Sequence, residues 1–206
     1  MSESEFIIRV GIDGDSEVGK TCIVNQYLYD TFVYKYTPTL GVDISIKECE
    51  QNNTNFRLHV WDLSGKEKYR LITKNYYRDL HGLLLVYDVS NPNSFSSVKS
   101  LIYDFQNINQ TTGGQIMILG NLKSNDRKVS YQEAHNFALE KGLQYIEVNA
   151  CNSEEVKIAV QHLINCVLCG VGKIPPEETS DQRGSYIDQL TSFLGRVGHS
   201  CCLGYK

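Results

Sequence analysis

The sequence predicts an α/β fold with a mostly parallel β-sheet, and three observations support this prediction. Segments with the apolar pattern of strands alternate with helical segments, as in sheets whose parallel strands are joined by helices. Residues 83–87 and 116–119 are continuous apolar runs, as expected for central strands covered on both faces. Residues 42–47 and 56–61 alternate with period two on either side of a turn at 51–54, which predicts one antiparallel hairpin.

The other elements are predicted from turn and capping signals. A strand at 6–12 precedes a helix at 21–28, and Ser130 with Glu133 forms a capping box that begins a later helix. Lys141-Gly142 ends that helix, and a strand follows at 142–148. A helix between the two apolar runs has one apolar face, made of Phe95, Val98, Leu101, Ile102 and Phe105.

The last predicted helix has Ser153 as its N-cap and ends near Gly170. Its apolar stripe consists of Val156, Ala159, Val160, Leu163 and Val167. We therefore expect residues 1–170 to form one domain. Residues 171–206, which include Pro175-Pro176, are expected to be a flexible tail. Four residues of this tail share a helical face, either by chance or in a short helix that docks on the domain or on a membrane: Ile187, Leu190, Leu194 and Val197.

Composition excludes several classes of protein. The chain of 206 residues has a net charge of −4, so it lacks the basic footprint of a nucleic-acid-binding protein. The first five residues are acidic and contain no apolar segment, so no secretory signal is expected. The aliphatic run at 83–86 is too short to cross a bilayer. Seven cysteines without paired spacing indicate reduced thiols in the cytosol.

The clearest motif is the phosphate-binding pattern G-x-x-x-x-G-K-[ST] between the first strand and the first helix. It comprises Gly14, Asp15, Ser16, Glu17, Val18, Gly19, Lys20 and Thr21. The glycines let the backbone curl around an oxyanion, and the following helix directs its positive dipole end toward the phosphates. Lys20 can reach the β- and γ-phosphates, and the Thr21 hydroxyl can bind Mg²⁺.

Later loops supply the other candidates for this site. Asp62 follows a strand and is placed to hold Mg²⁺ through water. Thr39 lies in a polar loop that could close its hydroxyl on the same metal, and Gly65 could offer its N–H to a γ-phosphate. Asn121 ends a strand where a base-binding loop is expected. The phosphate loop alone also fits an ATP-using kinase, but these later segments do not.

Several segments resemble the Rab family of the Ras superfamily of small GTPases. Residues 40–44 (Leu-Gly-Val-Asp-Ile) resemble I-G-V-D-F, and residues 61–67 (Trp-Asp-Leu-Ser-Gly-Lys-Glu) resemble W-D-T-A-G-Q-E. Residues 69–82 match the aromatic-rich second switch of that family nearly throughout. The resemblance covers residues 6 to about 170, and it extends to the twin Cys201-Cys202.

The resemblance implies the three-layer P-loop NTPase fold, with a six-stranded, mostly parallel sheet, one antiparallel edge strand and five helices. It also implies a GTP/GDP switch in vesicle traffic, with Mg²⁺ held by Thr21, Thr39 and Asp62. Phe32 should stack on the edge of the guanine, and Gly65 with Thr39 should sense the γ-phosphate. The other implied nucleotide contacts are Cys22, Asn121, Leu122, Ser124, Ala150 and Cys151.

Partners are implied by the same resemblance. Effectors should bind through loops 36–47 and 62–80, and an exchange factor and a GTPase-activating protein should act on the nucleotide. Rab escort protein and GDP-dissociation inhibitor would handle a monomer that carries prenyl groups. That monomer would be cytoplasmic and bound peripherally to the cytosolic face of an intracellular membrane. The sequence does not identify the organelle.

The chain departs from the family at catalytic and base-binding positions. Lys66 replaces the glutamine that orients the attacking water, and an ammonium group can only donate. We therefore expect slow hydrolysis, with Lys20 and Gly65 as the other catalytic groups; alternatively, Lys66 points to solvent. Either way, the function of the glutamine is missing.

The family's N-K-x-D motif corresponds to residues 121–124, Asn-Leu-Lys-Ser. Ser124 replaces an aspartate that makes a bidentate contact with guanine, a loss of about 1–3 kcal/mol. Leu122 removes the lysine stem over the base but could supply apolar cover. Asp126 could replace the missing carboxylate if the loop is remodelled.

Two further departures are milder. Glu17 replaces a glycine, which places a carboxylate near the phosphates and adds strain of about 1–2 kcal/mol if φ is positive there. Residues 149–151 (Asn-Ala-Cys) stand where the family has S-A-K, but the Ala150 backbone N–H can still contact the base.

The C-terminus resembles the doubly prenylated Rab pattern without matching a C-a-a-X box. Two chains, on Cys201 and Cys202, would suffice for stable anchoring. Two hypotheses remain for the whole chain: a slow GTPase switch, or a pseudo-GTPase scaffold with weak or no nucleotide binding.

Overall fold

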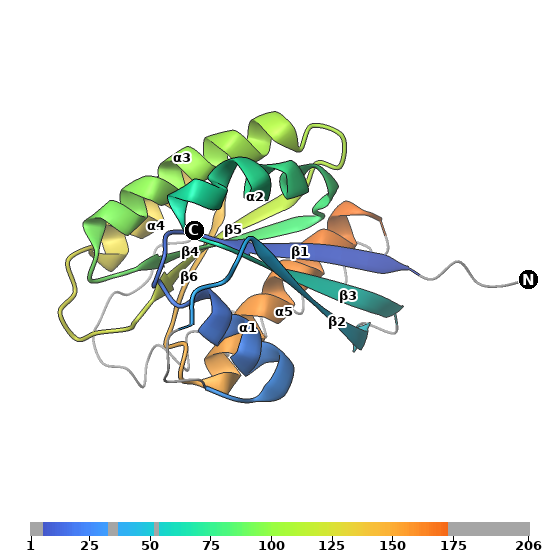
Figure 1. Cartoon of the computed structure of the whole chain (residues 1–206), viewed down its shortest axis with the longest axis horizontal. Coiled ribbons are helices and arrows are strands. Elements are labelled where there is room, and N and C mark those ends of the chain that lie inside the picture. The colour runs from blue at the N-terminus through green and yellow to red at the C-terminus, as the bar shows by residue number, and fades with distance from the viewer. Residues whose placement is uncertain (1–5, 33–36, 52–53, 173–206) are drawn as a thin grey trace, which may run out of the picture.

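The computed structural model describes residues 6–32, 37–51 and 54–172. Six strands form one sheet in the order β2-β3-β1-β4-β5-β6 (Figure 1). The strands are β1 Ile7–Asp13, β2 Val42–Gln51, β3 Thr54–Leu63, β4 Gly82–Asp88, β5 Gln115–Asn121 and β6 Gln144–Val148. Only the β2–β3 pair is antiparallel among these strands of the described residues, and the other pairs are parallel. The predicted mostly parallel sheet with one antiparallel edge strand is confirmed.

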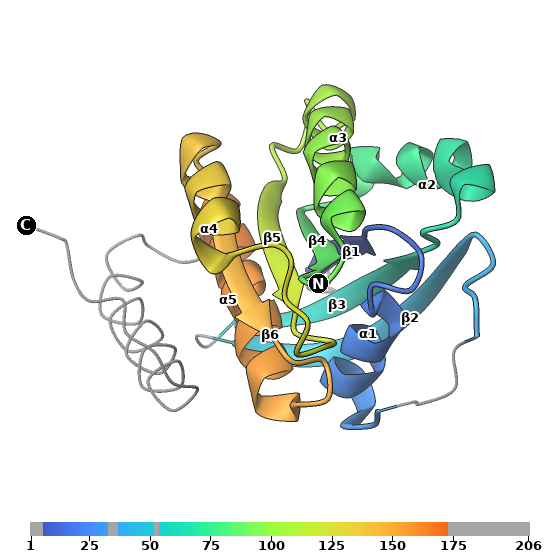
Figure 2. The same ribbon diagram turned by 90° about the vertical axis from the view of Figure 1, so that its left-hand side faces the viewer.

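Five α-helices complete a three-layer structure in the described residues (Figures 1 and 2). They are α1 Lys20–Tyr29, α2 Arg70–Tyr76, α3 Pro92–Ile108, α4 Tyr131–Glu140 and α5 Ser153–Gly170. Helices α1 and α5 cover one face of the sheet, and α2, α3 and α4 lie on the other (Figure 2).

Strand periodicity sorts the side chains of β1 between the two faces. Ile8, Val10 and Ile12 are buried in the cluster under α1 and α5. Gly11 points to the opposite face, where a Cβ atom would overlap the side chain of Leu80. Asp13 follows on that same face, so a carboxylate is buried at the end of the strand.

Most predicted helix boundaries are confirmed, and one cap is not. The Glu133 N–H donates to Ser130 Oγ at 3.2 Å, as a capping box requires. Ser153 was predicted to cap the last helix, but it is the first residue of α5. Asn152 is the cap, because its side-chain oxygen accepts from the N–H of Glu154 at 3.1 Å.

Helix α2 and the short 3₁₀ turns on either side of it were not predicted from the apolar pattern. Among residues 6–172, outside the gaps at 33–36 and 52–53, no helix has both the length and the apolar character that a membrane span needs. The apolar face at 187–197 and the two cysteines at 201–202 lie outside the described residues.

Candidate nucleotide-binding site

The phosphate loop connects β1 to α1 and has the backbone conformation that its glycines predict. Gly14 has φ 145° and Gly19 has φ 103°, both in the region that side chains avoid. A Cβ atom on Gly19 would overlap the side-chain nitrogen of Asn121. Glu17 also has positive φ, at 67°, so the predicted condition for strain at this residue is met.

Lys20 lies across the inside of this loop. Its Nζ donates to the carbonyl oxygens of Gly14 at 2.8 Å and Asp15 at 2.6 Å. Burial lowers the pKa of Lys20, and the nearby carboxylates of Asp13 and Asp62 oppose this shift. A bound phosphate would add negative charge beside the ammonium group and favour its charged form further.

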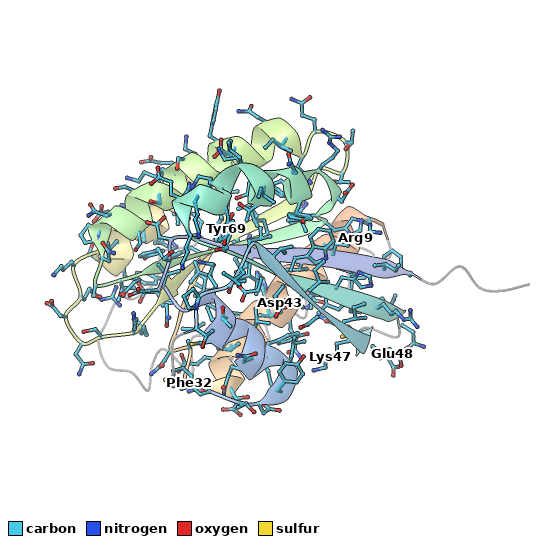
Figure 3. The ribbon with its side chains drawn as sticks, viewed as in Figure 1. Arg9, Phe32, Asp43, Lys47, Glu48 and Tyr69 are labelled. Atoms are coloured by element: carbon cyan, nitrogen blue, oxygen red, sulfur yellow. The ribbon has the colours of Figure 1, made fainter. Side chains whose placement is uncertain are left out.

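A cavity of about 370 Å³ opens beside the loop. The predicted site residues that line it are Ser16, Glu17, Gly19, Lys20, Thr21, Cys22, Phe32, Thr39, Gly65 and Lys66. Four lining residues were not predicted: Asn25, Thr37, Ser64 and Lys123. Phe32 lies beside α1, where Figure 3 labels it, and it also packs against the core cluster under α1 and α5. The site therefore brings together residues from the phosphate loop, α1, both predicted switch loops and the loop after β5.

Three oxygen-bearing side chains meet beside this cavity: Thr21 and Thr39, which line it, and Asp62, to which both are hydrogen-bonded. Thr21 Oγ1 donates to Asp62 Oδ2 at 2.5 Å and lies 3.2 Å from Thr39 Oγ1. Thr39 Oγ1 also donates to Asp62 Oδ2, at 3.3 Å. Asp62 Oδ1 is buried and has no hydrogen-bond partner in the described part of the chain. An oxygen-only donor set with a buried, unpaired carboxylate oxygen fits a hard divalent cation such as Mg²⁺.

Burial also affects the charge of Asp62. Desolvation raises its pKa, while the hydrogen bond from Thr21 and the charge of Lys20 oppose the rise. A divalent cation at this position would offset the desolvation and stabilise the ionised carboxylate.

Asn121 connects the phosphate loop to the loop that follows β6. Its Nδ2 donates to the carbonyl of Val18 at 2.8 Å, and its Oδ1 accepts from the Ala150 N–H at 3.2 Å. The structure thus joins the predicted Asn121 directly to the phosphate loop, and Ala150 to the loop through Asn121.

The other predicted base contacts lie further from the cavity. Leu122 packs against the core cluster under α3 and α4, and Cys151 is exposed. Ser124 is exposed, and its Oγ accepts from the backbone N–H of Asp126 at 3.1 Å. The carboxylate of Asp126 lies 3.4 Å from Lys128 Nζ, on the surface. None of these four residues lines the cavity described above.

Lys123 is a site residue that sequence reasoning missed. Its Nζ donates to the carbonyl oxygen of Glu17 at 2.9 Å, and its side chain lines the cavity. The predicted position for a base-covering side chain was Leu122, one residue earlier. Because Leu122 turns toward the core, its neighbour Lys123 projects to the nucleotide side. The signal available in the sequence was a lysine next to an apolar residue just after a buried strand.

Ser64 was also missed, and it connects the two predicted switch loops. Its Oγ donates to the Thr39 carbonyl at 2.8 Å, and its N–H donates to the Gly41 carbonyl at 2.9 Å. Gly65 follows so close to the backbone of Asp15 and Ser16 that a Cβ atom would overlap it. Thr39 and Gly65 are therefore held against the phosphate loop by contacts within the chain.

Comparison with known proteins agrees with this geometry. The model of the Ras family matches residues 9–169. The chain is 34% identical over 164 residues to Ras-related protein RABD2a of Arabidopsis thaliana, which covers 76% of this chain and 78% of the relative. It is 31% identical over 203 residues to GTP-binding protein YPTM2 of Zea mays, covering 92% and 97%. Identity to Ras-related protein RIC1 of Oryza sativa subsp. japonica is 33% over 162 residues, covering 76% and 78%.

The fold and the phosphate site together define a P-loop nucleotide-binding protein. Within that class, the chain belongs to the Ras family and, by its Rab-named relatives, to the Rab family of small GTPases.

Proposed function

We propose that this chain is a guanine-nucleotide switch in vesicle traffic that binds GTP or GDP with Mg²⁺ and hydrolyses GTP slowly. One observation carries the proposal: Lys20 and the oxygens of Thr21, Thr39 and Asp62 meet beside a cavity at the phosphate loop. These groups supply the positive charge and the hard oxygen ligands that a nucleoside triphosphate with Mg²⁺ requires.

In this proposal the phosphates lie against the backbone N–H groups of the loop, with Lys20 at the β- and γ-phosphates. Thr21, Thr39 and Asp62 would hold Mg²⁺, which supplies charge neutralisation of the phosphate oxygens when bound. Thr39 and Gly65 would respond to the γ-phosphate, because both already lie against the loop.

The proposed site lacks a group that hydrolysis requires. Lys66 lines the cavity, and by the resemblance to the Rab family it replaces the glutamine that orients the attacking water. Its ammonium group can donate to the γ-phosphate but cannot accept a hydrogen bond from the attacking water. We infer that nucleotide binding persists while the intrinsic rate of hydrolysis is low.

Guanine selectivity would rest on fewer contacts than in a typical relative. Phe32 and Lys123 line the cavity, and Asn121 with the Ala150 N–H, which bond to each other at 3.2 Å, would contact the base next to it. Ser124 is exposed and offers a single hydroxyl, so selectivity is weakened by about 1–3 kcal/mol.

Partners would bind where the two predicted switch loops expose apolar side chains. Among the described residues of 36–47 and 62–80, five are large, apolar and exposed: Leu40, Ile44, Ile46, Leu71 and Ile72. These side chains suit effectors, an exchange factor and a GTPase-activating protein.

We further propose a domain at 1–170 and a tail at 171–206. Prenyl groups on Cys201 and Cys202 of that tail, delivered by Rab escort protein and extracted by GDP-dissociation inhibitor, would anchor it to the cytosolic face of an intracellular membrane.

A pseudo-GTPase scaffold is the second candidate. It is favoured by Lys66, by the exposed Ser124, by Leu122 turned toward the core, and by the strained Glu17. The two candidates differ in whether the purified protein holds nucleotide, so a single measurement separates them.

That measurement is denaturing extraction of the purified full chain, with chromatography of the released nucleotide. GDP or GTP near one per protein supports the switch. A protein that is empty and also fails to take up labelled GTP with Mg²⁺ would refute the switch and leave the scaffold.

Restoring the glutamine tests the hydrolysis step. In single-turnover assays, Lys66→Gln should hydrolyse bound GTP at least about tenfold faster than wild type, because one well-placed hydrogen bond lowers the barrier by about 1.4 kcal/mol. Lys68→Gln, two residues later, is the control and should leave the rate unchanged. Equal rates for wild type and Lys66→Gln would mean that Lys66 is not the cause of slow hydrolysis.

A further inference from the structure

A buried carboxylate lies directly below the phosphate loop and has no part in the function proposed above. Asp13 is the last residue of β1 and is 4% exposed. Its Oδ1 accepts from the Gly14 N–H at 2.6 Å, and its Oδ2 accepts from the Tyr77 hydroxyl at 2.5 Å. One carboxylate therefore bonds both to the first residue of the phosphate loop and to the second switch segment, residues 62–80.

Tyr77 is held firmly at its own end of this contact. Its side chain is fully buried, and its ring packs edge-to-face on Phe105 of α3, with the ring centroids 5.3 Å apart. Asn109 Nδ2 donates to the Tyr77 carbonyl at 2.6 Å and to the Leu80 carbonyl at 2.9 Å. The tyrosine hydroxyl is thus presented to Asp13 by a rigid part of the molecule.

A second contact links the phosphate loop to the other end of α2. Arg70, the first residue of α2, lies 3.4 Å from the carboxylate of Asp15. Ser97 of α3 donates to the same carboxylate at 2.7 Å. Asp13 and Asp15 flank Gly14, so Arg70 at the start of α2 and Tyr77, which directly follows α2, contact the two neighbours of Gly14. Helix α2 lies beside α3 (Figure 1).

We propose that Asp13 and Tyr77 are a positioning pair for nucleotide binding, through which the second switch segment fixes the first turn of the phosphate loop. A buried carboxylate oxygen without a donor is unfavourable, so the hydroxyl of Tyr77 holds Asp13 in place. Asp13 in turn orients the Gly14 peptide, which precedes the N–H groups that face the phosphates. Without the link, the loop would hold nucleotide phosphates less firmly. This inference rests on the proposed function, in that the loop must bind nucleotide.

The test is the rate of release of fluorescent GDP from the full chain in the presence of Mg²⁺. Tyr77→Phe should release GDP about fivefold faster than wild type, the change expected from one lost hydrogen bond. The neighbouring Tyr76→Phe makes the same chemical change on the same segment and should release GDP at the wild-type rate. A rate for Tyr77→Phe equal to that of Tyr76→Phe would overturn the proposal.

Two further variants separate positioning from general loss of stability. Asp13→Asn should accelerate release less than Asp13→Ala, because its amide still accepts from Gly14 and can donate to the Tyr77 oxygen, although the Tyr77 O–H then loses its acceptor. Asp13→Ala and the double variant Asp13→Ala/Tyr77→Phe should release GDP equally fast, because both lack the same link. If the fold-increases in release of the two single variants multiply in the double variant, the two residues act independently and the shared role is contradicted. Ile164→Val, which loosens the core under α5, lowers the melting temperature without accelerating release.

Failure of the proposed function gives a different result. If wild type binds no nucleotide, amide hydrogen exchange of the free protein replaces the release assay. Gly14 should then exchange faster in Tyr77→Phe than in Tyr76→Phe. Equal exchange in the two variants would overturn the pair independently of nucleotide.

Discussion

Glu17 has the strained backbone of the phosphate loop, although its side chain is exposed. It has φ 67°, in the left-handed region, and its carbonyl accepts from Lys123 Nζ at 2.9 Å. Left-handed backbone at a non-glycine residue costs about 1–2 kcal/mol, and part of that cost is offset because glycine has more freedom in the unfolded chain. The loop keeps this conformation because the contacts around it, including Asn121 with Val18, determine it.

Replacing Glu17 therefore predicts a gain in stability. Glu17→Gly should raise the free energy of unfolding by roughly 0.5–1 kcal/mol, measured by urea denaturation without nucleotide. Glu17→Ala removes the carboxylate but retains the left-handed strain, so it should show no such gain. An equal gain in both variants would assign the effect to charge instead of backbone conformation.

The loop after β5 determines which side chain faces the nucleotide cavity. Leu122 packs into the core, and Lys123 points to Glu17. The loop is attached to β6 further on, where Arg127 donates to both carboxylate oxygens of Glu147, at 2.8 and 2.6 Å. This bidentate contact holds the later part of the loop to β6, and the Leu122 N–H holds its start by donating to the Val148 carbonyl at 2.8 Å.

Lys123 should accordingly contribute to holding nucleotide. Lys123→Ala should release GDP about five- to tenfold faster, since it loses both the contact with the phosphate loop and the apolar stem at the cavity. Lys123→Met keeps the apolar stem, so its rate of GDP release should lie between those of wild type and Lys123→Ala. Lys128→Ala, on the same loop but paired only with surface Asp126 in the described contacts, is the matched control. If Lys123→Ala released GDP at the wild-type rate, Lys123 would not contribute to nucleotide binding.

Figure 3 marks polar side chains on the outer strand β2, including Asp43, Lys47 and Glu48. Strand β2 pairs along its whole length with β3, so residues 42–47 of the first predicted switch loop form regular strand. Lys47 lies over the ring of Tyr27, 5.1 Å from its centroid, which joins this edge strand to α1. Movement on nucleotide exchange is therefore expected before residue 42 and not within β2.

One histidine connects three strands of the whole sheet. His81 Nδ1 accepts from the Arg9 N–H at 3.0 Å, and its backbone bonds to Arg9 and to Gln115 at 2.8 and 2.9 Å. Burial lowers the pKa of His81, with a smaller contribution from the charge of Arg9. The neutral ring is the form that can accept this hydrogen bond.

This contact predicts a pH dependence of global stability. Because the folded-state pKa lies below the unfolded value of about 6.5, the stabilisation is present above that pH and is lost as the pH falls through the folded-state pKa. His81→Asn keeps an acceptor at the same place without titrating. The melting temperature of wild type should therefore fall more between neutral and mildly acidic pH than that of His81→Asn. An equal fall in melting temperature for wild type and His81→Asn would mean that other groups determine the loss of stability in acid.

The sequence by itself determined the local parts of this protein. The phosphate loop is eight consecutive residues with its own backbone rules, and the strands and helices carry their burial pattern in their periodicity. For this reason the strands, the antiparallel hairpin and four of the helices were predictable. Helix α2 was not, because seven residues with exposed Leu71 and Ile72 show no apolar face of their own.

The tertiary structure alone decided which distant groups meet. Ser64 bonds to the Thr39 carbonyl, and Asp13 bonds to Tyr77 across 64 positions. Leu122 packs into the core and Lys123 faces the cavity in a loop whose Leu122 N–H donates to the Val148 carbonyl at 2.8 Å. A local pattern records how deeply a residue is buried, but it does not record what it is buried against. Contacts between segments far apart in the chain appear only once the sheet and its two helical layers have brought them together.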